Sequence, residues 1–198
     1  MTRTNKAGTR WTAAAVGSLV VVALLAWLAL AARPGDAPAA SAAKQARCAL
    51  GDRPAAELTV RELRKSVICR INRQRERRDT RSLSRSKKLQ KAAQKHTKVI
   101  VETECFAHQC PGEPELEQRI RRVGYLDGAR EWGYAESTGC AESAAAMVRN
   151  WLDIRFHRMN LLGAKFRDVG IGAAQGGPED RCKKGFATFT AVFGWRTR

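Results

Sequence analysis

Two histidines and a glutamate are the side chains of this sequence whose types best suit chemistry. The chain holds three histidines, His96, His108 and His157, and Glu136 lies in a stretch of apolar and small residues. Imidazole and carboxylate groups ligate divalent metals and act as general acids or bases. No H-E-x-x-H pair, G-x-S-x-G elbow or Cys-His signature accompanies them. The candidate site is therefore His108, Glu136 and His157, with Glu136 as the candidate catalytic group.

The two candidate histidines occur in segments that break regular structure. His108 lies in the turn-rich "CFAHQCPGEPE", and His157 interrupts the apolar "WLDIRFHRMNLL". Loops carry functional sites more often than cores do, so both positions favour a site. His96 differs, because it shares an apolar helical stripe with Leu89 and Ile100. We expect His96 to be a hydrogen-bonded core residue.

Helical periodicity dominates the first part of the folded region, and strand periodicity dominates its end. The spacing of apolar residues predicts helices at about 59–77, 86–102, 116–124 and 140–153. Two antiparallel strands joined by a loop are predicted within 166–175 and 185–195, and a strand or extended loop at 130–138. Helices first and strands last, without βαβ alternation, indicate an α+β fold in which helices cover an antiparallel sheet.

The N-terminal residues indicate that the chain is exported from the cytoplasm. Residues 1–32 have a basic start and a nearly uncharged apolar run, which suits a cleaved signal peptide or an uncleaved signal-anchor helix; its length favours the anchor. The positive-inside rule places the rest of the chain outside the cytoplasm in both cases. Residues 33–47 are rich in Ala and Pro and predict a linker. The folded domain is expected at 48–198.

All six cysteines lie in that predicted domain. An even number confined to an exported region favours disulfides. A zinc cage is the alternative, but no C-x-x-C pair occurs. Six cysteines allow fifteen pairings, and the residues alone do not choose among them. The cysteines are Cys48, Cys69, Cys105, Cys110, Cys140 and Cys182.

The chain is strongly basic, with a formal net charge of +17 at pH 7. Residues 61–91 carry thirteen basic and three acidic side chains. Such a surface attracts anionic polymers. However, no aromatic residue interleaves the basic ones as a base-stacking platform requires, and export argues against intracellular nucleic acid. We expect a solvated basic face on two helices rather than a nucleic-acid interface.

The order of several short motifs resembles one known family. In chain order they are "RINRQRERR", "LQKAAQKHTKVI", "CFAHQC", "RIRRVGY", "YAES", "VRNWLDIRFHRMNLL", "FRDVGIG" and "FTAVFG". Together they resemble the CAP (or SCP) domain of cysteine-rich secretory proteins, antigen 5 and pathogenesis-related proteins, and are closest to its bacterial secreted branch. The resemblance covers about residues 60–195.

The resemblance implies a three-layer α-β-α sandwich with an antiparallel sheet, here preceded by the apolar leader. It also implies a cleft in which two histidines and acidic residues hold a divalent metal, usually discussed as Zn²⁺. By position, these residues are His108, Glu136 and His157. Asn160 falls on an asparagine expected to brace its loop through backbone hydrogen bonds, and Ser137 stands beside Glu136 where the family pattern has asparagine.

The chain departs from the family pattern where a second glutamate is found in eukaryotic members. Ile154 occupies that place, and Ile154-Arg155-Phe156 replaces the Ser-Pro-Gly that precedes the second histidine. A three-member site still leaves an open position on zinc for water. Among the possible disulfides we favour Cys48 with Cys69 and Cys105 with Cys110, which leaves Cys140 with Cys182.

The expected function is that of an extracellular, non-catalytic binding module of the cell envelope with a cleft able to hold a divalent metal. Its ligand is expected to be a lipid, a cell-wall polymer or a protein, with membrane attachment through residues 1–32 if these are retained. The alternative is a zinc-dependent hydrolase, in which His108 and His157 hold the metal and Glu136 acts as general base.

Overall fold

The computed structural model describes residues 48–198. The predicted leader (1–32) and linker (33–47) lie outside the described residues. Within residues 48–198, the structure contains no helix of the length and apolar character needed to cross a membrane.

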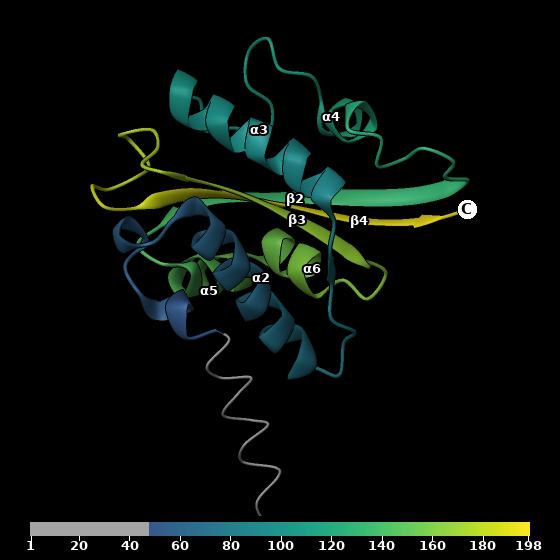
Figure 1. The fold of residues 1–198 in the computed structure, drawn as a ribbon, viewed down its shortest axis with the longest axis horizontal. Coiled ribbons are helices and arrows are strands. Elements are labelled where there is room, and N and C mark those ends of the chain that lie inside the picture. The colour runs from purple at the N-terminus through teal and green to yellow at the C-terminus, as the bar shows by residue number, and fades with distance from the viewer. Residues whose placement is uncertain (1–47) are drawn as a thin grey trace, which may run out of the picture. The chain divides into compact units, whose positions relative to one another are not determined.

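A four-stranded sheet forms the middle layer, in the order β1-β3-β4-β2 (Figure 1). Strand β4 pairs antiparallel with both β2 and β3, whereas the two-residue β1 pairs parallel with β3. The predicted antiparallel sheet therefore carries a short parallel addition that the sequence pattern did not indicate. The strands are β1 (Ser84–Arg85), β2 (Glu131–Ala141), β3 (Asp168–Gln175) and β4 (Ala187–Thr197).

Helices cover both faces of this sheet (Figure 1), which confirms the α-β-α sandwich. One face carries α3 (Lys87–Thr103) and α4 (Leu116–Arg122). The other carries α2 (Val60–Glu76), α5 (Ala144–Asp153) and α6 (Arg155–Leu162). Two short 3₁₀ turns, η1 (Ala49–Asp52) and η2 (Ala55–Glu57), precede α2.

The alternation of β4 explains why two cores form. Side chains of neighbouring strand residues point to opposite faces. Phe189 and Phe193 belong to the core beneath α2, α5 and α6, whereas Val192 belongs to the smaller core beneath α3 and α4. Every residue of β4 from Ala187 to Gly194 is buried, so both faces of the strand are covered; one face is apolar, and the other carries the buried hydroxyls of Thr188 and Thr190 beside Val192.

Two predicted boundaries differ from the structure. The helix expected at 140–153 begins at Ala144, because Cys140 and Ala141 still pair with β4 as the end of β2. The segment around His157 was expected to break regular structure but forms α6. Its inward stripe holds His157, Asn160 and Leu161, so the polar residues masked the helical periodicity.

The three disulfides join Cys48 to Cys69, Cys105 to Cys110 and Cys140 to Cys182. All three favoured pairings are therefore confirmed, with Cα–Cα distances of 5.6, 5.8 and 5.5 Å. These lie within the usual range for a bridged pair. Since all six cysteines are bridged, none is available as a thiolate nucleophile.

Two glycines of β3 allow α3 to approach the sheet. A β-carbon at Gly170 would overlap the backbone of Leu89 and Gln90, and one at Gly172 would overlap Ala93 and Thr97. We expect Gly170→Ala to lower the free energy of unfolding by about 2–3 kcal/mol, because α3 must move away from β3.

Urea denaturation tests this expectation. Gly112→Ala is the control, because Gly112 has open space around it and a φ of +76°. That change should cost only the backbone strain of about 1 kcal/mol. A smaller loss in Gly170→Ala than in Gly112→Ala would contradict the close approach of helix and strand.

Candidate functional site

Glu136 is an almost fully buried carboxylate on the edge strand β2. Its side chain is 2% exposed and faces α3 and α4, the same side as its cross-strand partner Val192. Arg119 of α4 donates from Nη1 to Oε2 at 3.0 Å and from Nη2 to Oε1 at 3.2 Å. This bidentate contact is the geometry in which a guanidinium binds a carboxylate most strongly. The carboxylate is therefore already neutralised by a protein cation.

His108 lies beside this pair in the loop between α3 and α4. Its Nδ1 is 3.0 Å from Oε1 of Glu136, and its backbone carbonyl accepts from Nη2 of Arg119 at 2.7 Å. The side chain is nevertheless 61% exposed, so one edge of the imidazole reaches solvent. The disulfide between Cys105 and Cys110 closes a small loop around His108. Loop, helix and strand thus meet at Arg119 and Glu136.

His96 is buried, as the helical stripe predicted, and it also contacts the site. Its Nδ1 is 2.6 Å from Oε2 of Glu113, and its Nε2 is 3.6 Å from Oε1 of Glu136. Glu113 is itself buried, with Oε1 3.7 Å from Nη1 of Arg119. Four side chains therefore share one buried charge cluster: His96, Glu113, Arg119 and Glu136.

The sequence interpretation missed two members of this cluster, Glu113 and Arg119. A usable signal existed for Arg119, which falls on the apolar stripe of α4 between Leu116 and Ile120. A charged residue on such a stripe is buried only with a partner. For Glu113, in a turn between two prolines, the sequence pattern gave no comparable sign.

His157 reaches the same strand from the opposite face of the sheet. Its Nδ1 is 3.0 Å from Oγ of Ser137, the residue after Glu136. Asn160, one turn later on α6, donates from Nδ2 to the backbone carbonyl of Glu136 at 3.0 Å. This hydrogen bond ties α6 to β2, whereas Asn160 was expected to brace a loop. Because Glu136 and Ser137 point to opposite faces, the described hydrogen bonds join His157 to Ser137 rather than to Glu136.

The three site groups have shifted pKa values with distinct causes. The hydrogen bond to Glu136 raises the pKa of His108 despite partial burial. Burial, helped by the positive charge of His108, lowers the pKa of His157. Burial alone would raise the pKa of Glu136, but the hydrogen bond from His108 and the charge of Arg119 outweigh it and lower that pKa. At neutral pH Glu136 is an anion held by the guanidinium of Arg119.

Titration of the histidines tests this arrangement. We expect His108 to titrate above, and His157 below, the usual imidazole pKa of about 6.5. Because the pKa of His108 is raised by folding, the stability it contributes is complete below its unfolded pKa and is lost as pH rises through its folded pKa.

NMR of the imidazole protons measures both values, with His108→Gln and His157→Gln assigning the signals. The two histidines serve as controls for each other, since their shifts have opposite signs. A higher pKa for His157 than for His108 would contradict the hydrogen bond to Glu136.

The arrangement around Glu136 does not fit a three-ligand metal site. Among residues 48–198, no group of three His, Cys, Asp or Glu side chains is placed to hold a metal ion. Both carboxylate oxygens of Glu136 accept hydrogen bonds from Arg119, at 3.0 and 3.2 Å. The positive charge of this guanidinium would repel a metal cation bound at the same oxygens. The zinc site stays a prediction from the family resemblance. Zinc content after dialysis, compared between the wild type and His108→Ala, tests it.

The chain belongs to the cysteine-rich secretory protein (CAP) family, whose model matches residues 69–193. The resemblance predicted from the motifs is therefore confirmed. A comparison with curated protein sequences gave no significant match.

Two solved structures share the fold. One is an extracellular protein containing an SCP domain from Bacillus anthracis, with a TM-score of 0.54, 22% identity, and coverage of 69% of this chain and 43% of that chain. The other is an outer surface protein from Borrelia burgdorferi, with a TM-score of 0.58, 18% identity, and coverage of 71% and 97%. This chain thus spans less than half the length of the Bacillus protein.

Proposed function

We propose that the protein is an extracellular binding module that acts without turnover, and that the surface of α6 contacts an anionic lipid surface. The observation that carries the proposal is the composition of this α6 surface, defined as Ile154, Arg155, Phe156, Arg158 and Met159. Phe156 and Met159 are 73% and 57% exposed and lie three residues apart, on one side of the helix. Exposed large apolar side chains clustered in this way mark interaction sites.

The arginines of the α6 surface indicate which class of ligand it would bind. Arg155 and Arg158 are exposed between the apolar residues, and the protein as a whole is strongly basic. An apolar strip interleaved with arginines suits the boundary between lipid headgroups and acyl chains, and anionic headgroups strengthen the attraction. Ile154, half exposed at the start of α6, extends the apolar strip.

The candidate site supports a role without turnover. Glu136 is paired with Arg119, so the carboxylate is not presented as a free base. The cysteines are all bridged. His157 is held by Ser137, and its lowered pKa keeps the imidazole neutral. These groups brace β2, α4 and α6 against one another, and thereby fix the position of the α6 surface.

Vesicle sedimentation tests the proposal with the fragment 48–198, which contains both cores and all three disulfides. We expect binding to vesicles containing phosphatidylglycerol and little binding to pure phosphatidylcholine. The double change Phe156→Ser with Met159→Ser should weaken binding at least about tenfold, since burying either side chain stabilises by about 1.5–3 kcal/mol.

The matched charge control compares two helices. Arg155→Ser with Arg158→Ser removes two charges from α6, and Lys91→Ser with Lys98→Ser removes two exposed charges from α3 on the other face of the sheet. The α6 pair should weaken binding more than the α3 pair. Equal effects would show binding by net charge alone, and retention on purified cell wall but not on vesicles would replace lipid with a cell-wall polymer as the ligand.

A further inference from the structure

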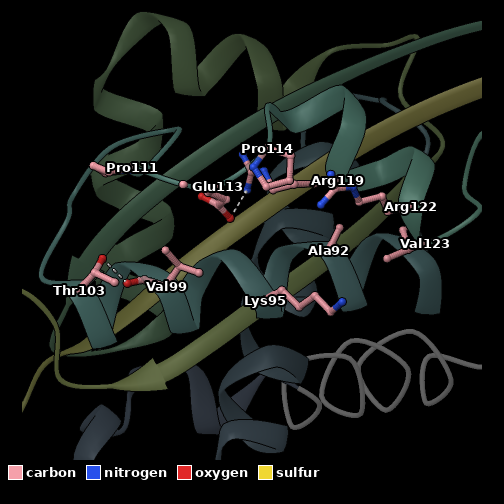
Figure 2. A pocket seen from close by; sticks show the side chains of 11 residues that line it. Ala92, Lys95, Val99, Thr103, Pro111, Glu113, Pro114, Arg119, Arg122 and Val123 are labelled. Atoms are coloured by element: carbon pink, nitrogen blue, oxygen red, sulfur yellow. Dashed lines mark hydrogen bonds and ion pairs between the residues drawn. The ribbon is translucent and has the colours of Figure 1, made fainter.

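A cavity of about 360 Å³ lies between α3, α4 and the segment 111–114 (Figure 2). The helices α3 and α4, which line it, lie on the face of the sheet opposite to α6 (Figure 1). Its volume is that of a pocket for a small organic molecule. Its walls mix apolar side chains with cations: Ala92, Lys95, Val99, Thr103, Pro111, Gly112, Glu113, Pro114, Arg119, Arg122 and Val123.

The cavity has an uneven charge distribution. Lys95 and Arg122, both exposed, lie toward one end in Figure 2, whereas Thr103 and Pro111 lie toward the other. Three cationic side chains line the cavity and only one carboxylate, that of Glu113, opposes them. That carboxylate is already engaged by His96 and Arg119. The lining therefore favours an anionic ligand.

Arg119, which lines the cavity, carries one buried donor that lacks an acceptor. The side chain of Arg119 is 5% exposed, and its Nε has no hydrogen-bond partner among the described residues. Its Nη atoms are occupied by Glu136 and by the carbonyl of His108. Because this Nε is buried as well as unpaired, it offers a ligand no direct hydrogen bond, and Arg119 contributes to the cavity through its charge.

We propose that this cavity binds a small organic monocarboxylate with an apolar body. The apolar body packs against Val99, Val123 and the prolines. The carboxylate lies toward Lys95 and Arg122, within the field of Arg119. An alcohol of the same shape would lack the charge that Lys95 and Arg122 attract, and an amine would be repelled by these two cations. The site is independent of the α6 surface, so each proposal can fail without the other.

Calorimetric titration of the full-length protein with octanoate and with 3-phenylpropanoate tests the proposal. The two acids distinguish an aliphatic from an aromatic body, and saturable binding of either one supports it. The matching alcohols should bind at least about tenfold more weakly, a loss of 1.4 kcal/mol or more. Equal affinity for acid and alcohol, or no saturable binding of either acid, would overturn the proposal.

Two kinds of variant locate the site. Lys95→Ala and Arg122→Ala should each raise the dissociation constant about three- to tenfold, whereas Lys98→Ala, an exposed lysine of α3 outside the cavity, should leave it unchanged. Val99→Trp should fill the cavity and abolish binding; if that variant does not melt as a folded protein, Val123→Phe replaces it. Equal dissociation constants for Lys95→Ala and Lys98→Ala would place the ligand elsewhere and overturn the assignment.

Discussion

Replacing Arg119 with methionine is expected to lower the free energy of unfolding at neutral pH by about 3–5 kcal/mol. The guanidinium is 5% exposed and pairs with Glu136, whose side chain is 2% exposed. Methionine fills a similar volume but leaves two buried carboxylates, Glu113 and Glu136, without their shared cation. The cost comes from the uncompensated charge rather than from lost packing.

The pH dependence separates this cause from a simple packing defect. In the wild type the pKa of Glu136 is lowered, so its contribution to stability is present above its unfolded pKa and is lost as pH falls through its folded pKa. In Arg119→Met the same carboxyl is buried without the guanidinium, and protonation relieves the penalty. The difference in stability between variant and wild type should therefore shrink as the pH is lowered.

Urea denaturation at several pH values measures this difference. Arg121→Met is the matched control on the same helix, because Arg121 pairs with Glu117 at 2.7 Å on the surface. An exposed pair spaced four residues apart contributes only about 0.3–0.5 kcal/mol. A loss in Arg119→Met no larger than in Arg121→Met, or a difference independent of pH, would contradict the account of the buried charge cluster.

Arg119 is a part of the site that the sequence pattern did not predict. Residue types and family motifs identified Glu136 and His108, because a carboxylate in a small-residue stretch and a histidine in a turn are visible locally. The group that holds Glu136 on β2 comes from helix α4, 17 positions earlier, and only the packing of α4 on the sheet brings it there. Long-range pairing of this kind leaves no periodicity in the chain.

His157 illustrates the converse error. The prediction that it lies in an irregular segment was wrong because an inward helical stripe of His157, Asn160 and Leu161 is too polar to count as an apolar face. The helix is stable because β2 satisfies that stripe: Ser137 pairs with His157, and the carbonyl of Glu136 accepts from Asn160. Local hydrophobic patterning cannot include hydrogen bonds that a distant strand provides. By contrast, α2, α3 and the two last strands were predictable, because their apolar residues face the cores directly.

Arg75 of α2 holds the end of α6, and its loss should have an effect of similar size to that of Arg119. The side chain is fully buried. Its Nε donates to the carbonyl of Arg81 at 2.8 Å, and its Nη1 donates to those of Leu161 and Gly163 at 2.7 and 3.2 Å. Asn72, three residues earlier, exchanges hydrogen bonds with the backbone of Leu83. This N-x-x-R pair thus ties α2 to the loop that follows it and to α6.

We expect Arg75→Met to lower the free energy of unfolding by about 3–5 kcal/mol. The buried carbonyl of Leu161 and the part-buried carbonyls of Arg81 and Gly163 lose their donor, and an unsatisfied buried acceptor costs about 1–3 kcal/mol. Arg75→Lys should recover only part of this, since an ammonium lacks the planar fork that reaches two chain segments at once. The exposed Arg77→Met is the control and should change stability by less than about 0.5 kcal/mol.

Hydrogen exchange distinguishes a local from a global effect of Arg75→Met. If Arg75 holds α6 in place, the variant should accelerate exchange relative to the wild type more for the amides of α6 than for those of α5. Both helices pack against β2. Because α6 carries the proposed lipid-contacting side chains, the same variant should bind phosphatidylglycerol vesicles more weakly even where most molecules remain folded. Uniform acceleration across α5 and α6 would instead mean that Arg75 supports the domain as a whole and does not specifically position the α6 surface.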